Sequence, residues 1–365
     1  MSSNRFESLA GAYTLIRPGT NPKQPLRAWD AADEYLIQLQ LSKNPEEPLL
    51  ILNDQFGALG TCLNVQTAAW VSDSYCAHQS LNKNLTENQI AHHFPCYNPV
   101  EDWAVEQGIN QALIKLPKNL SYLTFLLKKC SDLNISNVKI AGMMKHLPKN
   151  ILPFLQKFGE VNRLPFKKKA TIYELSITKA ISCPYPKNNT FSSIKLSSHA
   201  NVFGRDKLDP GAAFVIDNIN SLPKKQQVAD LCSGSGILGL AYLNKHPESQ
   251  VHFFDESYMA VDSSQRSCAL NQQSNVKFSW EDGLSNSQEY FDLIICNPPF
   301  HEEHTVGDHI AKRLFSDAKQ HLKPQGNVFI IGNRHLGYHA SLKKYFKHVE
   351  TIAANSKFIL LKAYG

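Results

Sequence analysis

The chain has 365 residues, of which 42% are hydrophobic and 19% are charged, the proportions of a globular protein. This length allows two domains, because a single hydrophobic core stops growing near roughly 250–300 residues. No apolar run reaches the roughly 18 residues that a membrane span requires, and the polar start from Met1 to Glu7 lacks the apolar stretch of a signal peptide. We therefore exclude a membrane-spanning class and expect a cytoplasmic protein, which we take to be a monomer.

The formal net charge of +6 is unevenly distributed along the chain. Residues 1–198 hold 21 Lys and Arg against 15 Asp and Glu, whereas residues 199–365 hold 17 of each. A basic excess in one half indicates an anionic partner there, most commonly nucleic acid, although a solvated basic face gives the same count. The eight cysteines include no Cys-x-x-Cys pair, so we expect reduced thiols and no disulfide framework.

The first half, residues 1–175, contains one informative pattern, an apolar stretch from Leu49 to Leu52 followed by Gly57 and Gly60. Residues 176–198 are rich in Ser, Asn and Pro and have no hydrophobic periodicity. Such a composition between two patterned segments predicts a linker.

The second half, residues 199–365, alternates short apolar strands with helices. Strands are predicted at 228–231, 251–255, 276–280 and 291–296, and helices from about 237 to 245 and from 258 to 270. Near-continuous apolar strands between helices indicate a parallel sheet that is covered on both faces. Three further strands, at 327–331, 349–353 and 357–362, are close enough in sequence to predict a terminal antiparallel hairpin.

The first half also resembles a faint copy of the second. Lys115 follows Asp73 by 42 residues, and Asn297 follows Asp255 by the same 42 residues. Aligning Asp73 with Asp255 therefore aligns Lys115 with Asn297. Other aligned pairs are Ile51 with Asp230, Gly57 with Gly236, and Gly60 with Gly239. Anchors in this order favour a duplicated domain. We therefore predict an α/β fold of two tandem Rossmann-like domains, a degenerate copy in residues 1–175 and a catalytic copy in residues 199–365.

A glycine loop, Gly234-Ser235-Gly236-Ile237-Leu238-Gly239, follows a predicted strand and precedes a helix. This pattern suits NAD, FAD or S-adenosylmethionine. Asp230 comes before the glycines, where a carboxylate can pair with the cationic amino-acid part of S-adenosylmethionine but would repel a pyrophosphate. Asp255 can accept from ribose hydroxyls, and Asp282 is placed to contact an adenine amino group. We therefore expect S-adenosylmethionine in a class I methyltransferase fold, bound by Asp230, Cys232, Gly234, Gly236, Asp255 and Asp282.

The tetrapeptide Asn297-Pro298-Pro299-Phe300 follows the fourth strand of this half. The side-chain carbonyl of Asn297 and the backbone carbonyl of Pro298 can each accept one hydrogen of an exocyclic amino group, so that its lone pair turns towards the methyl donor. The prolines stiffen the turn, and Phe300 offers a ring on which a base can stack, worth about 1–3 kcal/mol. The target base must be unpaired or flipped to reach such a site.

These residues predict a methyltransferase acting on an exocyclic amine. We expect Asn297, Pro298 and Phe300 to be catalytic, and Pro299 and His301 to line the substrate pocket. The run His301-Glu302-Glu303-His304 invites a zinc interpretation, but its histidines are three residues apart and no third ligand is evident, so no metal is expected.

With these motifs the chain resembles the ribosomal RNA guanine-N2 methyltransferases that are built from two tandem methyltransferase-like domains. The matching stretches are Ala28 to Tyr35, Leu52 to Leu59, His199 to Phe203, Asp255 to Ser257, Asn297 to His301, Asn333 to Leu336, and Lys357-Phe358. Asn53 to Gly57 and Asn333 to His335 favour the large-subunit members, whose target is guanine 1835 of 23S rRNA. The resemblance implies S-adenosylmethionine as cofactor, a first domain that helps to bind RNA, and Phe203 and Arg205 in substrate binding. One departure is Cys232, which stands where the family usually has glycine.

The residues alone leave alternatives open. The same motif serves guanine N2 in 16S rRNA, adenine N6 and protein glutamine, and an rRNA-binding assembly factor without catalysis is a possibility of another class. Intact Asp230, Asp255 and Asn297 argue against the last of these.

Overall fold

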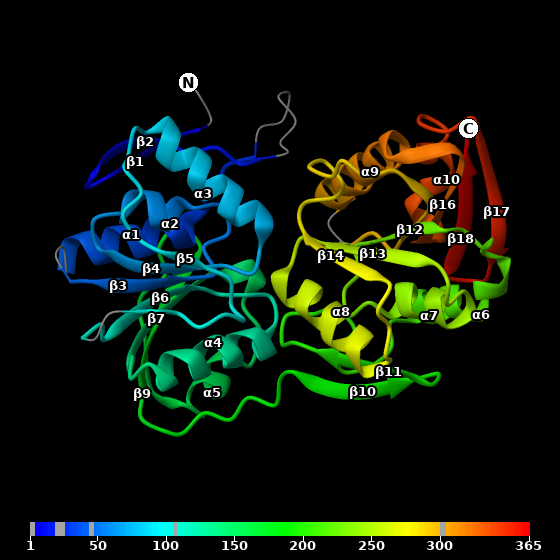
Figure 1. The fold of residues 1–365 in the computed structure, drawn as a ribbon. Helices are drawn as coiled ribbons and strands as arrows, with labels where there is room; N and C mark the ends of the chain where they lie inside the picture. The colour runs from blue at the N-terminus through cyan, green and yellow to red at the C-terminus, as the bar shows by residue number, and fades with distance from the viewer. Residues whose placement is uncertain (1–3, 19–25, 44–46, 106–107, 300–303) are drawn as a thin grey trace. The chain divides into compact units, whose positions relative to one another are not determined.

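The computed structural model describes residues 4–18, 26–43, 47–105, 108–299 and 304–365, the side chains of 304–308 excepted. The chain divides into two compact units, Met1–Pro184 (unit 1) and Tyr185–Gly365 (unit 2), each built on a seven-stranded sheet (Figure 1). In the described part of the chain no helix combines the length and apolarity that crossing a membrane would take.

The sheet of unit 2 has the order β14-β13-β12-β15-β16-β18-β17. Its strands are β12 (Gln227–Leu231), β13 (Gln250–Asp255), β14 (Val276–Trp280), β15 (Phe291–Cys296), β16 (Leu322–Asn333), β17 (His348–Ala354) and β18 (Phe358–Tyr364). The first five strands in this order are parallel, whereas β18 is antiparallel to both β16 and β17. The predicted parallel sheet with a terminal antiparallel hairpin is confirmed.

Helices cover both faces of this sheet (Figure 1). They are α6 (Pro210–Asp217), α7 (Ile237–Lys245), α8 (Tyr258–Leu270), α9 (His304–Gln320) and α10 (Tyr338–Leu342). Val228 packs in one core with Val215 of α6 and Leu240 of α7, whereas its neighbour Ala229 packs in another with residues of α9 and α10. Successive strand residues point to opposite faces, so a strand buried on both sides must be apolar throughout. This requirement explains the apolar runs in the sequence.

Part of the segment predicted to be a linker is ordered differently. Residues 187–198 form a hairpin, β10 (Lys187–Phe191) and β11 (Ile194–Ser198), whose turn residues Ser192 and Ser193 both have positive φ. The hairpin is attached to α8 through the backbone N–H of Ser197, which donates to Ser267 Oγ at 3.0 Å. Polar side chains at most positions of β10 hide its strand character from a pattern search.

Unit 1 repeats the sheet of unit 2 with the order β5-β4-β3-β6-β7-β9-β8, preceded by a separate hairpin. The hairpin strands are β1 (Arg5–Ser8) and β2 (Gly11–Thr14), and the sheet strands are β3 (Leu49–Leu52), β4 (Thr67–Val71), β5 (Cys96–Tyr97), β6 (Gln111–Lys115), β7 (Asn137–Met143), β8 (Gly159–Arg163) and β9 (Ala170–Ile177). The helices are α1 (Ala31–Lys43), α2 (Ala58–Cys62), α3 (Tyr75–Glu87), α4 (Leu120–Asp132) and α5 (Ile151–Leu155). The tandem architecture predicted from the sequence is confirmed.

Strand pairing shows how the two sheets correspond. In unit 1 the central strand β3 pairs Ile51 with Leu113 of β6, and in unit 2 the central strand β12 pairs Asp230 with Ile295 of β15. Two residues further along, β6 reaches Lys115 and the chain after β15 reaches Asn297, as the sequence alignment predicted. The other anchor, Asp73 on Asp255, is wrong by one residue. Ile51 pairs with Trp70 in unit 1, and Asp230 pairs with Phe253 in unit 2. Counting two residues further along each strand, Ser72 is the residue of unit 1 that corresponds to Asp255.

Lys115 therefore stands in unit 1 where Asn297 stands in unit 2, and its ammonium group is buried in an ion cluster. Its Nζ lies 2.6 Å from Asp30 Oδ1 and 2.6 Å from Asp33 Oδ2, and only 5% of its side chain is exposed. Burial alone would lower the pKa of Lys115, but the carboxylates of Asp33 and Asp30 raise it above its usual value. The positive charge of Lys115 therefore neutralises buried carboxylates of unit 1 and is not available to a ligand.

We predict that Lys115→Met destabilises unit 1 by about 3–5 kcal/mol at pH 7, because Asp30 and Asp33 are left partly or fully buried without their cation. Urea unfolding followed by circular dichroism measures the loss. A control is Lys128→Met, which removes a more exposed pair with Asp132 and should cost about 0.3–0.5 kcal/mol. Equal small losses in the two variants would contradict a structural role for the buried cluster.

Candidate active site

The predicted site residues of unit 2 gather at the carboxyl edge of its sheet. Asp230 lies on the central strand β12, Asp255 ends the neighbouring strand β13, and Asn297 follows the strand on the other side, β15. The helix after β12 packs on one face of the sheet and the helix after β15 on the other. Open parallel sheets bind ligands in the crevice that this reversal creates.

The loop between β12 and α7 has the backbone of a cofactor-binding turn. Gly234 and Gly236 have φ values of +58° and +82°, a region open to glycine and strained for other residues. A Cβ built on Gly234 would meet no atom within 4 Å, so the space above the loop is open. A Cβ on Gly239 would lie 2.3 Å from the ring of Phe253, so glycine there lets α7 pack closely on the sheet.

Cys232, the departure from the family pattern, also has a positive φ of +62°. This conformation explains why glycine usually occupies the position. The Cys232 thiol is hydrogen-bonded to the side chain of Cys296, and this contact together with burial holds the pKa of Cys232 well above its usual range. Since the thiolate is the reactive form, Cys232 is a packing residue rather than a nucleophile.

Asp230 is almost fully buried, and its two carboxylate oxygens differ. Oδ2 accepts a hydrogen bond from the backbone N–H of Gly239 at 2.8 Å, whereas Oδ1 is buried without a hydrogen-bond partner. Burial raises the pKa of Asp230 to about 7. A buried carboxylate oxygen without a partner is costly, so Oδ1 would be stabilised by a cationic group that came within reach of it.

The two other predicted acidic residues are held in different ways. Asp255 Oδ2 accepts from the N–H of Gly234 at 2.9 Å and its Oδ1 from Ser257 at 2.9 Å, so the carboxylate joins the glycine loop to the start of α8. Asp282 forms a two-pronged ion pair with Arg313 of α9. Its neighbour Glu281 is buried and has an unpartnered Oε2.

Asn297 has one satisfied and one open end. Its Nδ2 donates to Asp209 Oδ2 at 3.3 Å, whereas its Oδ1 is buried without a hydrogen-bond partner. Pro298 is buried and Pro299 is exposed. Phe300 and His301 lie outside the described residues, as do Glu302, Glu303 and the side chain of His304. The structure thus brings together a free amide oxygen and a stiff proline turn at the edge of the sheet.

Asp209 is a site residue that the sequence prediction missed. It lies 88 residues before Asn297 in the sequence, and no motif of the sequence analysis connected the two. Phe203, which the resemblance placed in substrate binding, is 68% exposed. Arg205 lies over the ring of Tyr185, with its guanidinium carbon 5.9 Å from the ring centre.

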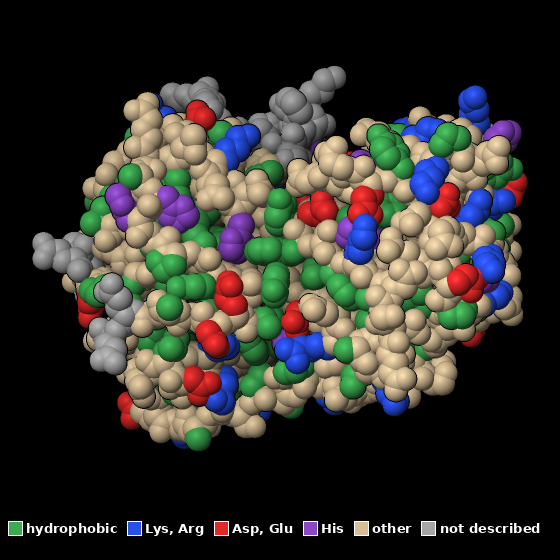
Figure 2. Space-filling view, viewed as in Figure 1, with side chains coloured by type: hydrophobic (Ala, Val, Ile, Leu, Met, Phe, Trp, Pro, Cys, Tyr) green, Lys and Arg blue, Asp and Glu red, His purple; other side chains and the backbone are tan. Residues whose placement is uncertain are grey.

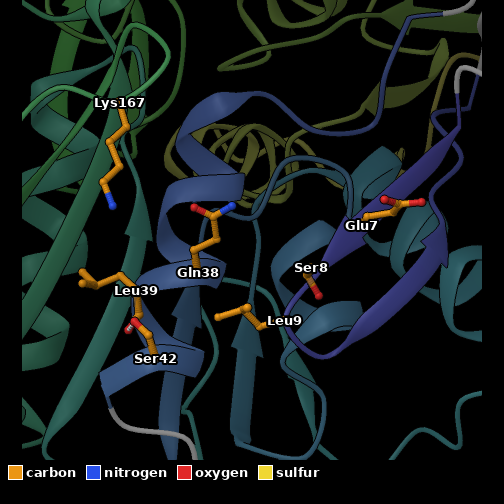
Figure 3. A pocket seen from close by; sticks show the side chains of 7 residues that line it. All are labelled: Glu7, Ser8, Leu9, Gln38, Leu39, Ser42 and Lys167. Carbon is orange, nitrogen blue, oxygen red and sulfur yellow. Dashed lines mark hydrogen bonds between the residues drawn. The ribbon is translucent and has the colours of Figure 1, made fainter.

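Unit 1 also has a hollow on its surface. It is formed by the β1–β2 turn, α1 and Lys167 (Figure 3). Its lining residues are Glu7, Ser8, Leu9, Gln38, Leu39, Ser42 and Lys167, none of which was predicted as a site residue. Among the residues that the structure describes, no three or more His, Cys, Asp or Glu side chains gather as a metal site requires.

Comparisons with known proteins agree with this architecture. The model of the RLMG N-terminal domain matches residues 3–179, and that of the Methyltransferase small domain matches residues 193–362. The Ribosomal RNA large subunit methyltransferase G of Pseudoalteromonas translucida (strain TAC 125) is 36% identical over 366 residues, covering 96% of this chain and 95% of the relative. That of Pseudomonas putida (strain W619) is 37% identical over 365 residues, covering 96% of both.

A solved structure has the same fold over nearly the full length. The T. thermophilus 16S rRNA N2 G1207 methyltransferase, in complex with AdoMet and guanosine, superposes with a TM-score of 0.76 and covers 99% of this chain and 97% of its own. At 18% identity this likeness supports the methyltransferase fold and no more. The relatives with over one third of their residues identical decide the family, as the sequence motifs predicted: the chain belongs to the family of ribosomal RNA large subunit methyltransferase G.

Proposed function

We propose that the protein methylates N2 of one guanine in 23S rRNA, in the cytoplasm, with S-adenosylmethionine as the methyl donor. The observation that carries the chemistry is the Asn297 amide, whose buried Oδ1 lacks a partner at the start of the proline turn. The large-subunit target rests on the name of the relatives. Guanine N2 rests on the resemblance of the motifs, and the solved relative is itself an N2 methyltransferase of G1207 in 16S rRNA.

Positioning accounts for the proposed reaction. The lone pair of an amino group conjugated to a purine is delocalised, so the group must be turned before it can attack. Asn297 Oδ1 and the Pro298 carbonyl accept its two hydrogens and direct the lone pair along the line of transfer. The bound cofactor supplies the methyl group from its sulfonium. The amino nitrogen that received the methyl group would become acidic and release one proton to water.

Four residues of unit 2 fit the cofactor. The unpartnered oxygen of Asp230 suits a cation, the open space at Gly234 allows a ligand to approach the backbone closely, and Asp255 borders the same loop. Gly236 has a positive φ and packs closely against Ser264, so it shapes the loop. Asp282 is less available to bind the adenine amino group than the sequence suggested, because its carboxylate already forms an ion pair with Arg313. We assign the adenine end to Glu281 and Asp282 together, with the open Oε2 of Glu281 as the acceptor.

Unit 1 is proposed to dock the RNA. Residues 144–179 hold eight Lys and Arg against two Glu. The net charge of this segment, +6, equals that of the whole chain. All eight cations are exposed. The N–H of Met144 donates to the carbonyl of Lys169 at 2.8 Å, which brings Lys145 and the Lys167–Lys169 turn together at the end of β7. Figure 2 shows Lys and Arg lying among Asp and Glu on one face of the molecule. A local excess of positive charge of the size found in residues 144–179 favours a polyanion.

Asn297→Ala should reduce kcat by about 100-fold or more, since it removes an acceptor aimed at the reacting amine. The dissociation constant of S-adenosylmethionine should stay within about threefold, because the cofactor loop is untouched. Methylated guanosine from 23S rRNA is measured by mass spectrometry, and cofactor binding by calorimetry. Asn188→Ala, an exposed position on β10, serves as control. Full activity of Asn297→Ala would overturn the proposed mechanism.

Asp230→Asn should stabilise the cofactor-free protein at pH 8 and leave it unchanged near pH 4. The folded-state pKa of about 7 lies above the unfolded value, so stability is present at low pH and is lost as pH rises from about 4 to 7. Removing the charge recovers about 1–3 kcal/mol, less than the full shift because a buried amide N–H is left unpaired. Urea unfolding at both pH values tests this.

The same variant should bind S-adenosylmethionine at least about tenfold more weakly at pH 8, because a charge-assisted contact is lost. In the wild type the affinity should rise between pH 6 and pH 8, as Asp230 becomes charged. Calorimetry across this range measures both effects. A wild-type affinity that is independent of pH would contradict the assignment of Asp230.

Lys145→Gln/Lys169→Gln should weaken RNA binding by about tenfold and reduce the slope of log affinity against log salt by about 1.5, because two phosphate contacts are lost. The matched control is Lys43→Gln/Lys83→Gln, two exposed lysines of the same unit. Filter binding at several salt concentrations supplies the readout. Equal losses in the two double variants would refute a specific docking surface at the end of β7.

A further inference from the structure

The function proposed for Asn297 requires its amide to face the substrate with the oxygen and not with the NH₂ group. The two ends of an amide have nearly the same shape, so packing alone does not choose between them. A flipped amide would present two N–H donors to an amino group that also carries only hydrogens. Some neighbouring group must therefore set the orientation.

That neighbour is Asp209, the residue that caps helix α6. Its Oδ2 accepts from the backbone N–H of Ala212 at 2.8 Å and lies 3.3 Å from Asn297 Nδ2. An ionised carboxylate has no hydrogen to donate, so only the NH₂ end of the amide can face it. A Cβ on Gly211 would come within 2.9 Å of the same oxygen. Glycine at this position thus leaves room for the carboxylate to serve both partners.

Unit 1 contains the same contact in altered form. Asp30 occupies the start of α1, where its Oδ1 accepts from the N–H of Ala32 at 2.8 Å. The same oxygen lies 2.6 Å from Nζ of Lys115, the residue that corresponds to Asn297. In both units an aspartate that caps the helix before the central strand holds the donor at the end of the fourth parallel strand. The recurrence argues against an incidental contact in unit 2.

We propose that Asp209 is a positioning residue that orients the Asn297 amide, so that its oxygen accepts from the amino group of the substrate. This inference rests on the function proposed above. Asp209 acts through Asn297 and does not touch the substrate. Its loss leaves cofactor and RNA binding intact but lowers the fraction of molecules whose amide is competent, and so reduces kcat without a change in KM.

The test compares three substitutions in the full-length protein. Asp209→Ser keeps an oxygen that can cap α6 but is too short to reach Asn297, and Asp209→Ala loses both contacts. Asp209→Asn keeps the length and one acceptor oxygen. We expect kcat to fall about 10- to 100-fold in the Ser and Ala variants and less than about fivefold in the Asn variant. KM for RNA and cofactor affinity should be unchanged in all three.

A capping control separates the two roles of Asp209. Ser74→Ala removes the side-chain cap of α3 in unit 1 and should leave kcat unchanged. In an Asn297→Ala background, Asp209→Ser should cause no further loss of methylation, because its effect passes through the amide. The proposal is overturned if Asp209→Ser has wild-type kcat, or if its loss of kcat is matched by lost cofactor binding or a lowered unfolding temperature. If the wild-type protein does not methylate guanine, the proposed function itself fails.

Discussion

The architecture of each unit depends on one buried hydrogen bond, from the backbone of the helix after the central strand to an aspartate carboxylate. In unit 2 the N–H of Gly239 donates to Asp230 at 2.8 Å, and in unit 1 the N–H of Gly60 donates to Asp54 at 2.9 Å. The first N–H groups of a helix have no partner within it, so a buried carboxylate satisfies one of them and fixes the approach of the helix to the sheet. The loop between strand and helix is held by the same contact.

The two units use this constraint differently because their neighbouring side chains differ. In unit 1 the carboxylate of Asp54 also accepts from the indole N–H of Trp70 at 3.1 Å. In unit 2 the position of Trp70 is taken by Phe253, which has no donor, and one oxygen of Asp230 stays open. The two carboxylates therefore have different surroundings: Asp54 Oδ2 accepts from two donors, whereas Asp230 Oδ1 has no hydrogen-bond partner.

The two units also differ at the end of the fourth parallel strand, β6 in unit 1 and β15 in unit 2. Lys115 turns its charge inward to Asp30 and Asp33, whereas Asn297 keeps an acceptor available beside Asp209. With its interior charges neutralised locally, unit 1 is left with surface lysines as its means of attracting an anion. The two units therefore share one scaffold and differ in the side chains at their strand ends. In the function that we propose, these side chains make unit 2 the catalytic copy and leave unit 1 to dock the RNA.

The sequence by itself determined the fold and marked candidate site residues, because both depend on short-range chemistry. Strands buried on both faces are largely apolar, glycine is favoured where φ is positive, and Asn297 is marked by the prolines that follow it. Only the tertiary structure decided which side chains complete the site. Asp209 meets Asn297 across 88 residues and Arg313 meets Asp282 across 31. The polar hairpin β10–β11 is ordered by its attachment to α8. Each of these contacts joins two segments that are distant in the sequence, and neither segment's own pattern reveals the other. The contacts can therefore be identified only after the sheet has brought the strand ends together.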